Sequence, residues 1–137
     1  MINIDLDGLV LGRAASIIAQ KLLEGEVVNA YNAEKVLITG NKLDIFAKYK
    51  ERMDYKGKAD PEKAPKYPKR PDMVFKRAVR NMLPHKKPRG RAAFKNLKVY
   101  MSNFDNVKVV SLEVAKVKSG LKYITLEVLA QKLGARV

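Results

Sequence analysis

The positive charge of this chain is concentrated in one internal segment. Residues 48–100 contain 18 Lys and Arg but only 5 Asp and Glu, a net charge of +13, whereas the rest of the chain carries only +1. Between Lys63 and Lys98 a single acid, Asp72, stands among thirteen basic residues. Because like charges at this density repel one another, the fold must place the segment on its outside, where a polyanion can neutralise it.

The rest of the composition excludes several classes of protein. The 137 residues, 47% of them hydrophobic, suffice for one domain, which we expect to span residues 1–137. Without cysteine and with one histidine, the chain offers no disulfide and little to build a metal centre from. No stretch approaches the roughly 18 apolar residues of a membrane span. The N-terminus also lacks the basic flank and apolar run of a signal peptide, so we expect a cytoplasmic protein.

Hydrophobic periodicity predicts strands and helices in mixed order. Strands are expected at 2–4, 27–31, 35–39 and 97–101. Helices are expected at 13–23, ended by Gly25, then after a cap at Asn41, at 71–83, at 91–96, and after a cap at Thr125 up to Gly134. Only a few residues separate the second strand from the third, too few for a parallel crossover. If these two strands are neighbours they must pair antiparallel, which predicts a mixed sheet. Residues 103–118 show strand-like pieces at 107–110 but no clear period.

Two of the expected helices have a basic face and an apolar face. In the helix after Asn41 we expect a buried face made of Leu43, Phe46 and Ala47. We expect a basic ridge on the same helix, made of Lys48, Arg52 and Lys56 at intervals of four. In the helix at 71–83 the spacing points Phe75, Ala78, Val79 and Met82 inward and Lys76, Arg77 and Arg80 outward. Between them, residues 57–71 carry four prolines among lysines and tyrosines, which predicts an extended basic arm or loop.

Three motifs occur in order along the chain. They are Leu11-Gly12-Arg13-Ala14-Ala15-Ser16, then Ile38-Thr39-Gly40-Asn41, then Met82-Leu83-Pro84-His85-Lys86-Lys87 with Gly90-Arg91 and Leu97-Lys98-Val99-Tyr100 after it. Together they resemble the thirteenth large-subunit ribosomal protein family, in its archaeal rather than its bacterial form. Asn81 and Ser102 stand where that family usually has glycine, and both departures concern turns. Residues 103–137 match no motif.

The resemblance implies a fold and a role. The fold is α/β, a three-layer α/β/α arrangement with a four-stranded mixed sheet plus a basic extended arm or loop. The role is that of a structural constituent of the large ribosomal subunit that binds large-subunit ribosomal RNA, contacts neighbouring ribosomal proteins and supports early subunit assembly. It implies no enzyme activity, cofactor, small-molecule substrate or homo-oligomer.

The candidate RNA-binding residues are His85 and the basic residues of the charged segment, with one more in the first motif. They are Arg13, Lys48, Arg52, Lys56, Lys58, Lys63, Lys66, Lys69, Arg70, Lys76, Arg77, Arg80, His85, Lys86, Lys87, Arg89, Arg91, Lys95 and Lys98. Their charges would neutralise phosphates and position the RNA rather than read its sequence. Four aromatic residues among the lysines could stack on unpaired bases or pack inside the protein: Tyr49, Tyr55, Tyr67 and Phe94.

Catalytic and nucleotide-binding interpretations fit less well. No carboxylate or nucleophile stands near His85 in the sequence to orient it or be activated by it. Gly8 and Gly12 lie between a strand and a helix, but neither a G-x-G-x-x-G run nor a Walker A lysine accompanies them. A free RNA-binding regulator outside the ribosome is the main alternative. A protein of the membrane surface is a third, which the prolines of the arm disfavour.

The charge of residues 48–100 makes a first prediction about the isolated protein. Its affinity for structured RNA should fall steeply with salt, because each neutralised phosphate adds roughly 0.7 to 0.9 to the slope of log affinity against log salt. Filter binding between about 50 and 200 mM salt measures this slope. A flat response would contradict the prediction.

Overall fold

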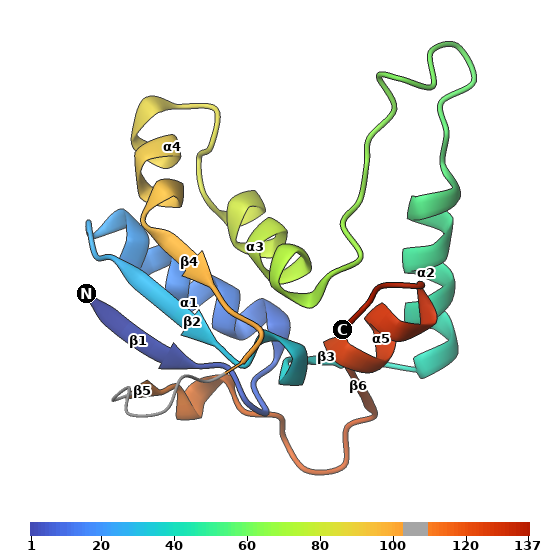
Figure 1. The fold of residues 1–137 in the computed structure, drawn as a ribbon. Coiled ribbons are helices and arrows are strands. Elements are labelled where there is room, and N and C mark those ends of the chain that lie inside the picture. Colours follow the sequence, from blue (N-terminus) through green and yellow to red (C-terminus); the bar gives the residue numbers. More distant parts are fainter. Residues whose placement is uncertain (103–109) are drawn as a thin grey trace.

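Two sheets and a set of helices make up the fold (Figure 1). This computed structural model describes residues 1–102 and 110–137. The larger sheet has the order β4-β2-β1-β5 and consists of β1 (Ile2–Asp5), β2 (Val28–Tyr31), β4 (Leu97–Val99) and β5 (Val110–Ser111). The smaller sheet pairs β3 (Leu37–Thr39) with β6 (Tyr123–Thr125). The helices are α1 (Leu11–Leu23), α2 (Lys42–Asp54), α3 (Pro71–Met82), α4 (Pro88–Lys95) and α5 (Leu126–Lys132).

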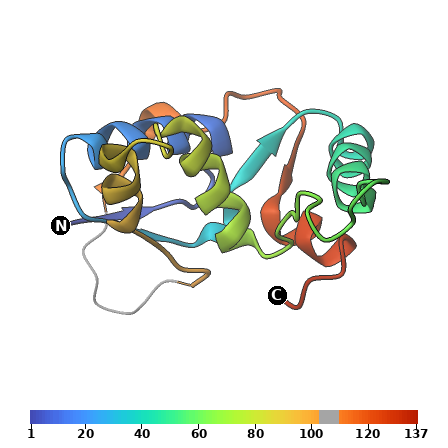
Figure 2. The ribbon, with the colours of Figure 1, turned by 90° about the horizontal axis from the view of Figure 1, so that it is seen from above.

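The α/β class is confirmed, but the expected mixed sheet is wrong. All neighbouring pairs in the larger sheet are parallel, and the antiparallel pairing occurs in the separate β3–β6 sheet. The helices α1, α3 and α4 lie together on one side of the larger sheet (Figure 2). Among the described residues no helix lies against its other face, so the expected three-layer arrangement is not seen there.

The turn after β2 explains why β2 and β3 do not pair. Asn32 adopts the left-handed conformation, with φ of 58°, and its side-chain amide donates to Asp5 Oδ1 at 2.8 Å. A short 3-10 helix, η1 (Ala33–Lys35), comes next and carries the chain away from the larger sheet. The backbone around β3 then pairs elsewhere, since the Leu126 amide donates to the Val36 carbonyl and the Leu37 amide donates to the Leu9 carbonyl.

The helix expected at 13–23 is confirmed as α1, together with its buried face. Ala15, Ile18, Ala19 and Leu22 are all buried. Gly25 ends the helix, as expected, with a φ of +95° that other residues rarely adopt. The expected start of α5 is also confirmed, because the Thr125 hydroxyl accepts a hydrogen bond from the Val128 amide.

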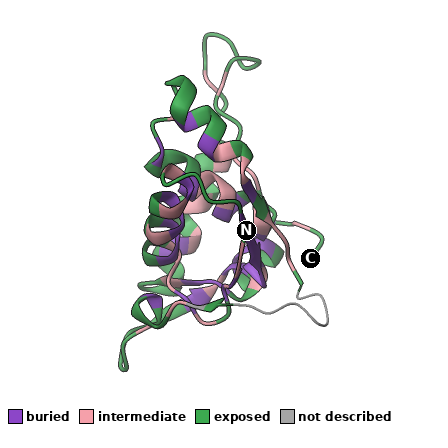
Figure 3. Cartoon of the chain, turned by 90° about the vertical axis from the view of Figure 1, so that its left-hand side faces the viewer, coloured by how far each residue is buried: buried purple, intermediate pink, exposed green. Residues whose placement is uncertain are grey.

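The core gathers the inner faces of α1 and α3 over the sheet, where buried residues form one continuous cluster (Figure 3). In α3, Phe75 and Val79 are fully buried as predicted. The prediction for Met82 is wrong, because its side chain is 44% exposed. The helix ends at Met82, and the buried Leu83, four residues after Val79, takes the inner position instead.

The inner face of α2 differs from the predicted one. Leu43 is 74% exposed and Ala47 is exposed, whereas Ile45 is buried. Tyr49 and Met53, at intervals of four from Ile45, pack partly buried against the core, as does the expected Phe46. Asn41 caps the helix as expected, with its side-chain oxygen accepting from the Leu43 amide. The inner stripe of α2 therefore places Tyr49 on the side of the helix that faces α3.

Phe75 tests this account of the core. Phe75→Ala should lower the free energy of unfolding by about 3 to 5 kcal/mol, because it leaves a cavity between α3 and its neighbours. Met82→Ala, on the same helix but 44% exposed, should cost less than half as much. Chemical denaturation measures both, and equal losses would show that the core is assigned wrongly.

Candidate nucleic-acid interface

The candidate residues are nearly all on the surface. Sixteen of the nineteen are exposed, and the three that are half-buried are Lys76, Arg77 and His85. In the described residues, the ion pairs among the candidates are Lys63 with Asp60 at 3.1 Å and Arg70 with Asp72 at 3.1 Å. Exposed pairs of this kind contribute little to stability, so most of the positive charge is left for a partner.

The proline-rich segment forms an arm, as predicted. Residues 55–70 contain no helix or strand and project from the body of the protein between α2 and α3 (Figure 1). The arm carries Lys56, Lys58, Lys63, Lys66 and Lys69, all exposed. Since α2 ends at Asp54, Lys56 belongs to the arm, and only Lys48 and Arg52 form the expected ridge on the helix.

The end of the arm is held against α3 by Arg77. The Arg77 guanidinium lies 4.2 Å from the centre of the Tyr67 ring and donates to the Lys66 carbonyl at 2.8 Å. Arg52 approaches the same ring from α2, at 6.0 Å. The expectation that Arg77 simply faces away from the protein is therefore wrong: it holds the arm as well as adding charge.

A groove on the outer side of α3 combines cations with apolar groups. Its volume is about 470 Å³, and it is lined by Lys66, Tyr67, Pro68, Met73, Lys76, Arg77, Arg80 and Phe94. The Lys76 ammonium lies 5.4 Å from the centre of the Phe94 ring. The groove starts at the end of the arm, and four of its lining residues are basic while none is acidic. This charge suits the phosphate backbone of a nucleic acid.

The loop between α3 and α4 and the first turn of α4 present a second group of charges. Lys86, Lys87 and Arg91 are exposed, and so is Arg89, although its guanidinium also donates to the Leu23 carbonyl at the end of α1. Gly90 makes this tight loop possible, because a Cβ there would overlap the Pro84 carbonyl. Proline at the first position of α4 starts that helix at residue 88, earlier than expected.

Arg13 lies apart from these groups. It belongs to the first turn of α1, and its guanidinium donates at 3.3 Å to the carbonyl of Lys116, outside the basic segment. Lys95 and Lys98 are exposed at the end of α4 and in β4. The groove on the outer side of α3 brings Lys66 of the arm together with Lys76, Arg77 and Arg80 of α3. Arg13, Lys95 and Lys98 do not line it.

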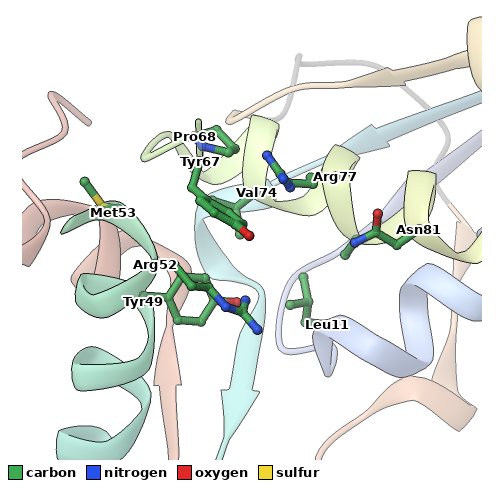
Figure 4. A pocket seen from close by; sticks show the side chains of 10 residues that line it. Leu11, Tyr49, Arg52, Met53, Tyr67, Pro68, Val74, Arg77 and Asn81 are labelled. Carbon is green, nitrogen blue, oxygen red and sulfur yellow. The ribbon is translucent and has the colours of Figure 1, made fainter. Parts of the chain in front are cut away.

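A pocket lies between α2, the end of the arm and α3 (Figure 4). Its volume is about 270 Å³. Tyr49 and Arg52 enter it from α2, Tyr67 from the arm, and Arg77 and Asn81 from α3. Asn81, expected at a turn, instead lies in the last turn of α3 and lines the pocket. The pairing of the two tyrosines was not predicted, although the three-residue spacing of Tyr49 and Arg52 puts both on one face of a helix.

Tyr49 keeps its proton in this pocket. Burial raises the pKa of the Tyr49 phenol above its usual value of 10, and the charge of Arg52, 5.5 Å from the ring centre, opposes the rise. A tyrosine phenol is neutral at physiological pH even with its ordinary pKa, and the rise extends the neutral form to more alkaline pH, so the hydroxyl can donate a hydrogen bond.

His85 is half-buried in the basic loop, and its backbone amide donates to the Leu83 carbonyl. No cluster of three or more metal-ligating side chains occurs in residues 1–102 and 110–137. Over the same residues, none of the helices has the length and apolar character needed to cross a bilayer.

Comparison with known proteins gives consistent matches over nearly the whole chain. The family model described as ribosomal protein L13 matches residues 1–106. The chain is 46% identical to large ribosomal subunit protein uL13 of Methanosphaera stadtmanae, with 97% of this chain and 96% of that protein covered. It is 45% identical to the uL13 protein of Methanocaldococcus jannaschii, with 99% of both covered. It is 40% identical to the uL13 protein of Haloarcula marismortui, with 96% of this chain and 90% of that protein covered.

Arg77 tests how the arm is held. Arg77→Ala should release the arm, because it removes both the contact with Tyr67 and the hydrogen bond to Lys66. Cleavage by a Glu-specific protease at Glu62, within the arm, should become faster, and the protein should lose about 1 to 3 kcal/mol of stability. Arg80→Ala, one turn along and exposed, is the control and should change neither. Equal cleavage of the two variants would rule out this role.

Proposed function

Since this chain belongs to the ribosomal protein L13 family, we propose that it is a structural constituent of the large ribosomal subunit and has no enzyme activity. It binds large-subunit ribosomal RNA through its basic surface and supports early subunit assembly in the cytoplasm. Identities of 40 to 46% to the named relatives, over nearly the full length of each chain, support this proposal. The family assignment thus favours a ribosomal role over that of a free RNA-binding regulator.

The proposal rests on one observation, which is that the basic side chains lie on the surface and the apolar core lies beneath them. We take residues 1–137 as one domain. In residues 1–102 and 110–137, most of the buried apolar residues belong to one cluster, and most basic side chains of residues 48–100 are exposed. Folding uses only some of these charges. In the described residues Lys63 and Arg70 have acidic partners, and Arg77 and Arg89 donate to backbone carbonyls. Ribosomal RNA phosphates would neutralise the exposed charges, and the released counterions would supply the binding free energy.

We propose that most of the RNA contacts come from three places. The arm contributes Lys56, Lys58, Lys63, Lys66, Lys69 and Arg70; α2 and α3 contribute Lys48, Arg52, Lys76, Arg77 and Arg80; the α3–α4 loop, α4 and β4 contribute His85, Lys86, Lys87, Arg89, Arg91, Lys95 and Lys98. Arg13 adds a contact at the start of α1. Neighbouring ribosomal proteins are the other partners, and we expect no homo-oligomer.

A matched pair of charge variants tests the proposal. Lys86→Gln with Lys87→Gln should reduce incorporation into large subunits, because both side chains are exposed in the basic loop. Lys118→Gln with Lys122→Gln removes the same charge from exposed positions outside residues 48–100 and should incorporate normally. Both double variants should melt like the unmodified protein.

Sedimentation of cell lysates on a gradient measures the outcome. The unmodified chain should travel with large subunits, and the Lys86 and Lys87 variant should be enriched in the light fractions. A chain that stays light without any substitution would contradict the ribosomal role. Equal incorporation of the two variants would contradict the assignment of the loop to RNA.

A further inference from the structure

The pocket between α2 and α3 has features that phosphate neutralisation alone does not require. Two aromatic rings, two guanidinium groups and one amide enter it, from Tyr49, Tyr67, Arg52, Arg77 and Asn81. No acid lines it. Its volume of about 270 Å³ lies just below the roughly 300 to 1,000 Å³ of typical small-molecule sites. The occupant must therefore be small, compatible with cations and able to pack on flat groups.

We propose that this pocket receives the base of one unpaired nucleotide of the large-subunit ribosomal RNA. The proposal rests on the proposed function and adds a specific contact to it. Unstacked bases pack on aromatic rings and on guanidinium planes, and they form hydrogen bonds along their edges. The pocket offers rings, guanidinium planes and an amide edge at Asn81 within one small space.

The arrangement of the charged groups supports a nucleotide in particular. The Arg52 guanidinium lies 5.5 Å from the centre of the Tyr49 ring and 6.0 Å from the centre of the Tyr67 ring, so one cation lies near both rings. Arg77 covers Tyr67 at 4.2 Å and also lines the outer groove of α3. Tyr67, Pro68 and Arg77 line both the groove and the pocket, so an RNA strand whose phosphates follow the groove would pass beside the pocket and bring a base to it.

Two of the four aromatic residues considered for base stacking line the pocket. Tyr49 and Tyr67 line it, whereas Tyr55 lies outside it and is 61% exposed. Phe94 lines the outer groove, beneath the Lys76 ammonium. The base contact is therefore assigned to Tyr49 and Tyr67.

A variant that fills the pocket without changing charge gives the sharpest test. Ala78 lines the pocket from α3, and Ala78→Met would occupy the space of the base while keeping every cation. Methionine is well tolerated in helices. Ala92→Met, at an exposed position of α4 that does not line the pocket, is the matched control. The probe is a transcript of the large-subunit ribosomal RNA from the same organism.

The expected results concern affinity and base reactivity. Ala78→Met should bind the transcript about tenfold more weakly than Ala92→Met, as for loss of one stacked base, with an unchanged salt slope. Chemical modification should show one unpaired nucleotide that is protected by the unmodified protein and by Ala92→Met but reactive with Ala78→Met. Melting temperatures of the two variants should agree within a few degrees.

A second pair of variants keeps the test decisive if Ala78→Met folds poorly. Arg52→Gln and Lys48→Gln each remove one charge from the exposed ridge of α2, but only Arg52 lines the pocket. Arg52→Gln should lose the protection of the same nucleotide and about tenfold in affinity, whereas Lys48→Gln should lose no more than about threefold.

The outcomes separate this proposal from the proposed function. If each pocket variant behaves like its control and no nucleotide changes in reactivity, the pocket holds no base, although salt-dependent binding of ribosomal RNA still stands. If the unmodified protein does not bind the transcript, the proposed function fails, and the base site fails with it.

Discussion

The packing of α3 against α1 is the contact on which the rest of the structure depends. Phe75 and Val79 of α3 are fully buried against the core, and Ile18 and Leu22 of α1 are buried with them. Since the inner face of α3 is fixed in this way, its other side must carry Arg77 and the outer groove. The same helix then sets where the arm ends and where the loop toward α4 begins. One apolar contact thus positions most of the basic surface.

Local signals in the sequence predicted the helices better than the sheets. The caps at Asn41 and Thr125 and the stop at Gly25 depend on neighbouring residues alone, and all three are confirmed. Strand pairing depends on distant segments. The mixed sheet, expected if 27–31 and 35–39 are neighbours, does not form, because β3 pairs with β6 from far along the chain. The strand-like piece at 107–110 lies outside the described residues except for Val110, which starts β5.

The candidate surface was predictable in composition but not in arrangement. Charge counts alone predicted that residues 48–100 would be exposed and would need a polyanion. They could not show that Arg77 contacts Tyr67, because the arm between α2 and α3 must first fold back. The α2–α3 pocket was missed for a similar reason: the inner stripe of α2 begins at Ile45 rather than Leu43, which turns Tyr49 toward α3. Function here rests on charge that folding leaves unpaired, arranged by contacts that only the fold creates.

A cryo-electron-microscopy structure of the large ribosomal subunit from the same organism would test the central claim most directly. The claim is that the basic surface of residues 48–100 is the RNA-binding surface and that the core beneath it only positions that surface. The expected result is that this chain is part of the subunit, with the arm, the outer face of α3 and the α3–α4 loop against ribosomal RNA phosphates. A subunit without the chain, or one in which these residues face solvent, would contradict the account.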